Sequence, residues 1–562
     1  MLRIPSDGVW RGVFPSEFAG NLWHASKIDL ERQKGKVMLG DSFTDLIDSA
    51  DDADLGLPVA FVRTAADNTD KWWALAGAVL FKSTNTDPES SWAQDAVASS
   101  PTDAESDAIE FIDALITSSD TDLDRLAAGT WTNPWWSTLT GASALGSTPH
   151  RFCIFAGALF ITDGRFINDY DGTTARDPAL TLPADQQMNW VEPAGDFAFM
   201  GGQAVGGTFE AEIFHWNRTS VTFNARYGSG DSQVFAGFVV HGIPHIVTRK
   251  GEIKRFTGQG YRTVAKFPAA DLGIVIADLH PNGVVVDKNI VKMLVRFGAT
   301  TSANGFGLQS LRVLDGTWTY DADTNNLYHS GALTNTVASN DYGQLEMAGS
   351  GAMIYTNPSQ GRYLVGGQLY TVYDGTARYG IFSSDEGSTS NRGYFITPKI
   401  ASPDVKAWFS RFVPKFRRFD TSTDRLRFAY RVRDSNTLPA YETITWVSTT
   451  TFTGTNADAA VGDFVEILAG ANAGAIAKIT AITGTPTRTF TIDLTLNSST
   501  STARARYLPF IDLGTISSQN LQSAIMGIAS RSEWLQLLVE LRGSESSPQL
   551  ENLSLEMTPV PA

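Results

Sequence analysis

The sequence has a single cysteine, Cys153, among 562 residues, and it has fewer basic than acidic side chains. One cysteine cannot form a disulfide within the chain, so the fold must be held by packing or by assembly. The 60 acidic and 44 basic residues give a formal charge of −16. This balance argues against stable nucleic-acid binding, which needs Lys and Arg to replace the counterions of phosphates.

Long apolar runs are also lacking. The first residues, MLRIPSDGVWRGVFPSEF, have no apolar core of the signal-peptide type. No stretch approaches the roughly 18 to 20 apolar residues that would span a bilayer. We therefore expect a protein that folds in a cytoplasm and does not insert into a membrane.

Helical signals are few. Residues 25–36 and 46–57 could each form a short helix, and residues 517–534 have a mixed pattern. Elsewhere short apolar runs alternate with Gly, Asp, Asn, Ser and Thr, and the chain contains 50 glycines. This pattern predicts an all-β protein with many turns, and a hydrophobic content of 42% supplies ample core.

The middle of the chain repeats one plan: an apolar strand, a glycine-containing corner, a second strand and a polar turn. The repeat is seen in residues 108–126, 151–174, 195–220, 232–267, 305–321 and 361–382. Propeller blades take roughly 40 to 50 residues each, so the region from about 57 to 383 would hold six or seven. The sequence predicts a degenerate six- or seven-bladed β-propeller over residues 57–394.

The peptide YDGTTAR at 170–176 returns almost unchanged as YDGTAR at 373–378, and a third Asp-Gly pair stands at 315–316. Asp-Gly suits tight turns between strands because it tolerates positive φ. We interpret these copies as turns between the outer strands of a repeated β-unit, not as a reactive motif.

The pattern of apolar and polar residues changes near residue 395. Apolar residues alternate from Leu426 to Val432, and again within 533–543 and 550–557. Such alternation predicts antiparallel strands with one buried and one wet face.

These strands predict the domain organisation. Residues 395–446 and 505–562 would form a jelly-roll β-sandwich, and residues 447–504, rich in Thr, Ala and Gly, an inserted small β-barrel. Residues 1–56 would be an N-terminal strap with short helices.

No catalytic motif is present: the sequence has no Gly-x-Ser-x-Gly elbow, phosphate loop or dinucleotide fingerprint. His241 and His245 have strand spacing but no third ligand nearby, so packing is favoured over a metal site. Residues 321–326 start like a calcium loop but lack its later ligands. We expect no enzyme activity, cofactor or metal. The remaining enzymatic alternative is a glycoside hydrolase with paired carboxylates in a central channel.

Two sets of residues are candidates for binding. The first is a basic region that could be a solvated sheet face or a docking surface for an acidic neighbour, such as another copy of the chain. Its members are Arg411, Lys415, Arg417, Arg418, Arg425, Arg427, Arg431 and Arg433. The second is Trp131, Trp135 and Trp136, which would fill a gap between blades or, in the alternative, stack on sugars.

Three stretches resemble bacteriophage virion proteins. They are GNLWHASKIDLERQKGKVMLG (20–40), the insert GDFVEILAGANAGAIAKIT (462–480) and the ending EWLQLLVELRGSESSPQLENLSLEM (533–557). Together with the degenerate propeller they are similar to the large β-propeller proteins of phage tails, such as nozzle and tail-tip proteins. The ending is similar to the last strands of jelly-roll modules in tail and host-attachment proteins.

The resemblance implies a structural protein of the virion tail that is assembled in the host cytoplasm and forms a homo-oligomeric ring with neighbouring tail proteins. DNA would pass through the ring transiently during ejection. The alternative within the same resemblance is a virion-surface adhesin that binds a host glycan.

Overall fold

The structure is a computed structural model. It describes residues 2–4, 24–26, 28–29, 36–39, 41–48, 52–77, 79–95, 107–119, 121–146, 149–206, 210–267, 275–287, 290–297, 306–314, 317–321, 345–348, 351–357, 362–371, 377–389, 392–401, 407–432, 441–467, 475–496, 502–543 and 548–559. Within these residues the protein is all-β, as predicted, and its helices are two single 3₁₀ turns, η1 (Trp136–Thr138) and η2 (Pro281–Gly283).

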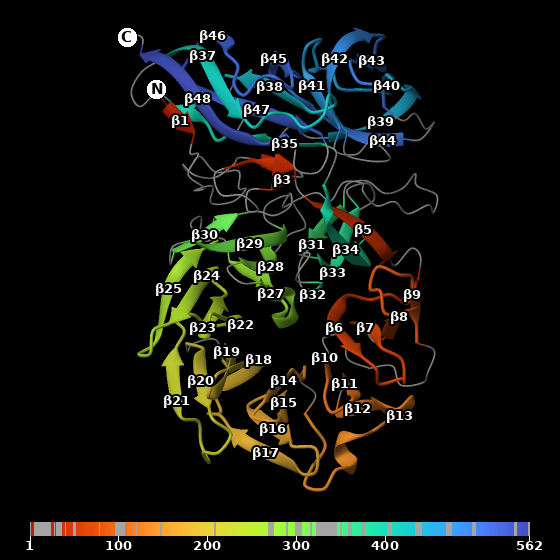
Figure 1. Ribbon diagram of the computed structural model, residues 1–562, viewed down its shortest axis with the longest axis vertical. Helices are drawn as coiled ribbons and strands as arrows, with labels where there is room; N and C mark the ends of the chain where they lie inside the picture. The colour runs from red at the N-terminus through yellow and green to blue at the C-terminus, as the bar shows by residue number, and fades with distance from the viewer. Residues whose placement is uncertain are drawn as a thin grey trace.

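The larger part of the molecule is a ring of seven antiparallel sheets (Figure 1). The first three sheets comprise β6 (Pro58–Thr64), β7 (Lys71–Ala76), β8 (Val79–Ser83) and β9 (Trp92–Gln94); β10 (Ala108–Glu110), β11 (Ala114–Ser119), β12 (Asp122–Ala127) and β13 (Thr130–Thr132); and β14 (Phe152–Phe155), β15 (Ala158–Asp163), β16 (Phe166–Tyr170) and β17 (Ala175–Thr181). The next two comprise β18 (Gln186–Ala194), β19 (Phe197–Ala204), β20 (Glu212–Trp216) and β21 (Ala225–Gly228); and β22 (Val234–Val240), β23 (Ile243–Thr248), β24 (Glu252–Phe256) and β25 (Tyr261–Lys266).

The last two sheets have five strands each. The sixth comprises β26 (Ile276–Asp278), β27 (Val284–Asp287), β28 (Ile290–Phe297), β29 (Phe306–Leu314) and β30 (Thr317–Asp321). The seventh comprises β31 (Leu345–Ala348), β32 (Met353–Asn357), β33 (Arg362–Thr371), β34 (Ala377–Thr389) and β5 (Asp41–Asp48).

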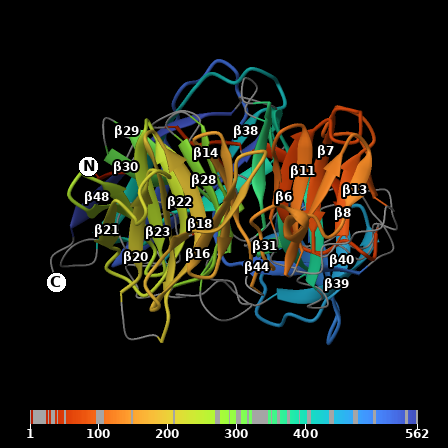
Figure 2. The same cartoon turned by 90° about the horizontal axis from the view of Figure 1, so that it is seen from below.

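The sheets form a closed, propeller-like ring. The inner strands β6, β10, β14, β18, β22, β27 and β32 contact one another in turn, and β32 returns to β6. Seen from below, the strands run along the ring axis (Figure 2). The core lies between neighbouring sheets, since each of the seven sheet-to-sheet interfaces has its own apolar cluster.

Each ring sheet buries both of its faces. Adjacent residues on a strand point to opposite faces, and on β7 Trp72 packs toward the seventh sheet while Trp73 packs toward the second. On β15, Phe160 and its neighbour Leu159 likewise belong to different clusters. Burial on both sides explains why the ring strands are apolar runs without clear alternation.

The YDGT turn has the predicted role at its first copy. Tyr170 ends β16 and pairs with Ala175 at the start of β17, so the turn joins the two outer strands of its sheet. The Asp171 carboxylate accepts hydrogen bonds from the backbone N–H groups of Thr173 and Thr174, and Gly172 has φ +96°. The Asp-Gly pairs at 315–316 and 374–375 lie outside the described residues.

The described residues of the strap contain no helix. They include the strands β2 (His24–Ser26), β3 (Ile28–Asp29), β4 (Met38–Leu39) and β5, which take the place of part of the predicted helices. β5 is the outer strand of the seventh sheet, where Ile47 lies opposite Ile381 and is buried. Pairing with a free sheet edge overrides the weak local helical pattern.

The C-terminal part consists of two facing sheets and a closed barrel. One sheet has the order β1 (Leu2–Ile4), β48 (Leu550–Pro559), β37 (Ala407–Phe416) and β46 (Met526–Ser532). The other has the order β2, β35 (Arg392–Ile396), β47 (Trp534–Arg542), β38 (Arg425–Arg431) and β45 (Ile511–Ile516), with β36 (Ile400–Ala401) beside β47. Because β1 pairs with β48, the two termini lie together.

The barrel is larger than predicted. Its six strands are β39 (Tyr441–Ser448), β40 (Thr451–Gly454), β41 (Phe464–Ile467), β42 (Ile476–Thr483), β43 (Arg488–Ile492) and β44 (Thr502–Leu508). It therefore takes in residues 441–446 and 505–508, which the sequence pattern assigned to the sandwich. Those residues pair with each other across β39 and β44, which closes the barrel.

The predicted wet face of β38 and β47 is also buried. Leu537 and Val539 face the sandwich core as expected, but Leu538 on the opposite face packs against Phe464 and Leu508 of the barrel. The barrel covers this side of the sheet, so both faces of its central strands are removed from water.

The place of β5 in the ring core can be tested by truncating Ile47. The change Ile47→Ala should lower the free energy of unfolding by about 2–4 kcal/mol in urea titrations, because a buried side chain is replaced by a cavity. Val221→Ala is the matched control, since Val221 is 93% exposed and its loss should change stability by less than about 0.5 kcal/mol. Equal effects of the two changes would contradict the position of β5.

Candidate functional site

The predicted basic region is divided by the fold. Arg411, Lys415, Arg417, Arg418 and Arg425 are exposed. Arg427 and Arg431 are buried, with 7% and 2% exposure, so they are not part of a docking surface. Arg433 lies outside the described residues. Arg427 and Arg431 are buried because the barrel covers the face of β38 from which their side chains project.

Two of the residues that remain exposed, Arg411 and Lys415, lie on an outer basic face of the sheet of β37. Alternation along β37 points Phe409 and Phe412 into the core and leaves Trp408, Arg411 and Lys415 on the solvent side. Arg531 of β46 lies directly opposite Trp408. We call Trp408, Arg411, Lys415 and Arg531 the outer basic face. Glu556, which pairs with Arg411, is an acidic group beside it.

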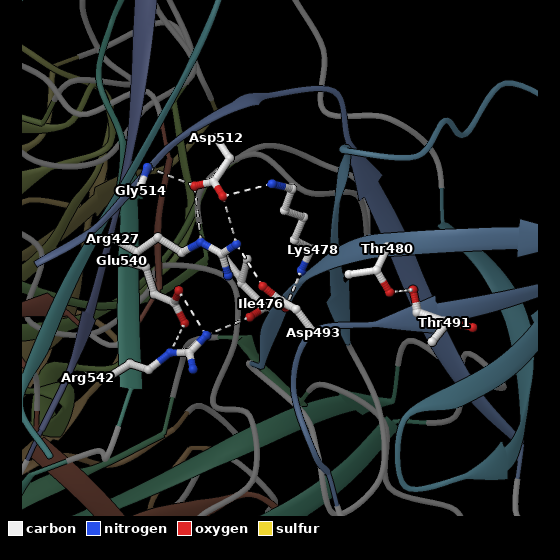
Figure 3. Close-up of polar contacts among 10 residues, drawn as sticks. All are labelled: Arg427, Ile476, Lys478, Thr480, Thr491, Asp493, Asp512, Gly514, Glu540 and Arg542. Atoms are coloured by element: carbon white, nitrogen blue, oxygen red, sulfur yellow. Dashed lines mark hydrogen bonds and ion pairs between the residues drawn. The ribbon is translucent and has the colours of Figure 1, made fainter. Parts of the chain in front are cut away.

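Arg427 instead holds the barrel to the sandwich (Figure 3). Its guanidinium donates to Asp493, at 2.8 Å, and to Asp512, at 3.2 Å. Lys478 of β42 reaches the same Asp512 carboxylate at 3.0 Å. Burial opposes ionisation of Asp512, but the hydrogen bonds from Arg427 and Lys478 hold its pKa below the ordinary value.

A second ion pair supports this junction. Arg542 of β47 binds its neighbour on the same face, Glu540, with Nε to Oε1 at 2.6 Å, and it donates from Nη2 to the carbonyl oxygen of Ile476 in the barrel at 3.0 Å. Deeper in the junction, Glu466 and Arg506 form a buried pair at 3.6 Å. These contacts fix the barrel as one unit with the sandwich.

The tryptophans are packing residues. Trp135 and Trp136 are 6% and 0% exposed and belong to the cluster between the second and third ring sheets. Both side chains fill space between the two sheets and have almost no surface in contact with solvent. Trp131 is half-buried and packs against the cluster between the first and second sheets.

The histidines do not form a pair of ligands. His241 is exposed in the turn between β22 and β23, whereas His245 is buried, stacks on Phe238 and contacts the carbonyl oxygen of Ile243. Within the described ranges, no three His, Cys, Asp or Glu side chains gather as a metal site. No helix there is long and apolar enough to cross a membrane.

The centre of the ring holds a polar cluster that sequence reasoning missed. We call it the axial cluster: Asp107 before β10, Arg151 before β14, Glu192 on β18, and His280 and Asn282 at η2. η2 contacts β6, β22, β28 and β32, so it lies across the ring interior. The usable signal in the sequence was a charged residue within or just before an apolar inner strand, as in RFCIF and DAIEF.

Asp107 is the best-satisfied member of the axial cluster. Its carboxylate accepts from the backbone N–H groups of Ala108, at 2.8 Å, and Phe152, at 3.0 Å. The Asn282 amide donates to it at 2.6 Å and also to the carbonyl oxygen of Val59 at 3.0 Å. With 4% exposure and three hydrogen-bond donors, Asp107 has the surroundings of a structural carboxylate.

Glu192 has an unusual proton affinity. Burial inside the ring, followed by the negative charge of Asp107, raises the pKa of Glu192 to about 8, although part of its side-chain surface remains accessible. The same two carboxyl groups, after burial itself, raise the pKa of the Cys153 thiol. At neutral pH Glu192 is therefore mostly a neutral hydrogen-bond donor.

Comparisons with known proteins give no family. No family model matches the chain, and no curated protein matches it. A computationally designed protein, Ika8, has a TM-score of 0.36 at 12% identity, over 61% of this chain and 99% of that one. A chain of the mitotic checkpoint complex has a TM-score of 0.38 at 10% identity, over 63% of this chain and 93% of that one.

An extracellular domain assigned to a hybrid two-component system of B. thetaiotaomicron has a TM-score of 0.40 at 11% identity, over 77% of this chain and 59% of that one. All of these scores are below 0.5, so we draw no conclusion about fold or function from them.

The junction network predicts different effects for two arginines on one strand. Arg427→Ala should lower the free energy of unfolding by roughly 3 kcal/mol, because it removes the cation that binds Asp493 and leaves Asp512 with Lys478 alone. Arg425→Ala, at an exposed position of β38, should change it by less than about 0.5 kcal/mol. The measurement is urea unfolding of both variants at pH 7.

The Arg427 effect should shrink as the pH falls below about 4. A depressed carboxyl pKa contributes stability above the unfolded value, 3.8 for Asp512, and this contribution is lost as the group becomes protonated. An effect of Arg427→Ala that is independent of pH down to 2 would contradict the ionic origin.

The raised pKa of Glu192 predicts that its contribution to stability is lost as the pH rises, opposite to the contribution of Asp512. Because its folded pKa is raised, its contribution to stability is full below the unfolded value of 4.5 and is lost as the pH rises to about 8. Relative to Glu192→Gln, the wild type should lose up to about 1.4 kcal/mol per pH unit across this window. Parallel stability curves for the two proteins between pH 4.5 and 8 would show that Glu192 has an ordinary pKa.

Proposed function

We propose that this protein is a structural component of a bacteriophage virion, a tail nozzle or tail-tip protein that assembles into a ring of identical copies. The observation that carries the proposal is that the N-terminal strands complete sheets in both halves of the molecule. β5 completes the seventh ring sheet, whereas β1 and β2 are edge strands of the two sandwich sheets. These pairings join the ring to the sandwich through hydrogen-bonded strands, which suits a particle part that must resist mechanical force.

The finer fold assignment is part of this proposal. We interpret the ring as a seven-bladed propeller, closed by β5 as the outer strand of its last blade. We interpret the sandwich as a jelly roll, because its strands pair as nested hairpins: β1 with β48, β35 with β47, β37 with β46 and β38 with β45. The barrel is then an insertion between β38 and β45, at the tip of the rolled hairpin.

The charge distribution supports assembly from identical copies. In an antiparallel sheet, the turns after the first and third strands lie at the same end. In the ring these turns carry a series of acidic residues: Asp70, Asp87, Glu89, Asp113, Asp171 and Asp196. The outer basic face is of opposite charge, so one copy can dock its basic face on the acidic end of the next. A head-to-tail contact of this kind closes into a ring when its rotation allows.

The assembly proposal predicts that charge reversal on the outer basic face prevents ring formation. Lys415→Glu with Arg531→Glu should leave a folded monomer where the wild type forms a ring, as measured by native mass spectrometry and electron microscopy. The matched control is Arg226→Glu with Arg262→Glu, two exposed arginines on the outer strands of the ring. The control variant should assemble like the wild type.

A compensating variant tests the pairing of the two surfaces. A second variant, Asp113→Lys with Asp196→Lys, reverses the charge of the acidic ring turns. Mixing it with the Lys415→Glu, Arg531→Glu variant should restore assembly. A wild type that remains monomeric both alone and with neighbouring tail proteins would overturn the assembly proposal. Selective binding of such a monomer to a host polysaccharide would point to the adhesin instead.

A further inference from the structure

Two isoleucines are exposed at the end of the ring that carries the acidic turns. Ile112, in the turn between β10 and β11, is 56% exposed, and Ile154, near the end of β14, is 42% exposed. Ile154 lies opposite Leu159, which packs between the second and third sheets, so both side chains are on the same side of their sheet. A Cβ on Gly172 would lie 2.8 Å from Cδ1 of Ile112, so the Ile112 side chain reaches the third sheet. The two isoleucines therefore border the same junction.

The backbone at Ile112 is strained. Its φ is +50°, and Asp113, the next residue, has φ +53°, so both lie in the left-handed region. A β-branched residue rarely adopts this region, whereas Gly and Asn adopt it readily. The corresponding turns after β14 and β22 have glycines, Gly157 and Gly242, at their second positions. Strain of this kind occurs at functional sites, and here it holds an apolar side chain in water, which indicates a contact outside the chain.

The outer basic face also has exposed apolar side chains. Trp408 is 43% exposed. The segment before β46 runs beside the end of β37, where Ser523 pairs with Lys415. Met526 packs on the sandwich core, and adjacent residues of an extended chain point to opposite sides, so Ile525 points outward. Ile525 is 68% exposed and lies on the same side as Lys415.

The two surfaces have complementary chemistry. We call the surface at the ring end the turn patch, and its members are Ile112, Asp113, Ile154 and Asp171. The two aspartates are exposed beside the isoleucines, just as the basic residues are exposed around Trp408 and Ile525. Apolar side chains surrounded by polar ones are the arrangement of a protein interface, in which a few aromatic and apolar side chains supply most of the binding energy.

We propose that the outer basic face of one copy docks on the turn patch of the next, with Trp408 packed against Ile112 and Ile154. This inference rests on the proposed head-to-tail assembly and names the contact that supplies most of its affinity. The opposite charges select the partner surface and are screened by salt, whereas the apolar contact is not. Docking would also remove the Ile112 side chain from water.

The first test measures the dissociation constant of self-association by sedimentation velocity in about 0.1 M and about 1 M NaCl. Trp408→Ser should raise this constant roughly tenfold at both salt concentrations. Ile112→Asn should have a similar effect without lowering the thermal unfolding midpoint, because Asn tolerates positive φ. The matched control is Val461→Ser, at a 61% exposed position of the inserted segment, which should leave the dissociation constant unchanged.

Cross-linking tests which surfaces meet. The natural Cys153 is buried, so a short bismaleimide should react with introduced thiols instead. A copy with Ile112→Cys mixed with a copy with Trp408→Cys should give a cross-linked pair. A copy with Val461→Cys mixed with the same Trp408→Cys copy should not.

The outcomes separate this contact from the assembly proposal. Weaker association of both variants, together with the selective cross-link, supports the contact. Rings that form with the wild-type dissociation constant in Trp408→Ser and Ile112→Asn, or that give no selective cross-link, overturn it and leave the assembly proposal standing. A wild type that is monomeric by itself overturns the contact, and one that stays monomeric with neighbouring tail proteins overturns the assembly proposal as well.

Discussion

The burial of both faces of every ring sheet is the constraint on which the rest of the structure depends. A sheet that packs on two neighbours must present apolar side chains at successive positions, as Trp72 and Trp73 do. The seventh sheet packs on the first, so each ring sheet has a neighbour on both of its faces. The space between neighbouring sheets is consequently apolar, and a buried polar group near the axis, such as Asp107, is satisfied by hydrogen bonds from neighbouring segments.

The same constraint operates where the barrel meets the sandwich. The barrel removes the second face of β38 and β47 from water, and charged residues on that face become internal ion pairs. Arg427 pairs with one carboxylate of the barrel and one of the sandwich, so a residue that the sequence pattern placed on the surface links the two domains. On the sheet of β37, which has no covering layer in the described residues, Arg411, Lys415 and Arg531 stay exposed.

Charges of both signs are exposed on the molecule, but acidic residues recur on the turns at one end of the ring, paired ions lie at the junction, and basic residues gather on the outer basic face. This distribution is what makes contact between unlike surfaces of two copies favourable. It also explains how a chain of formal charge −16 can carry a basic surface.

Local periodicity and turn chemistry in the sequence were sufficient to predict the all-β class, the repeated order of strands and turns, the change of pattern near residue 395 and the turn at Asp171. The sequence also predicted the core positions of Leu537 and Val539. The strands of the strap, the limits of the barrel, the burial of Arg427 and the axial cluster could not be predicted in this way. These depend on partners far away in the chain: β5 needs the edge of β34, Arg427 needs a barrel that is inserted later, and Asp107 meets Asn282 only because the ring closes.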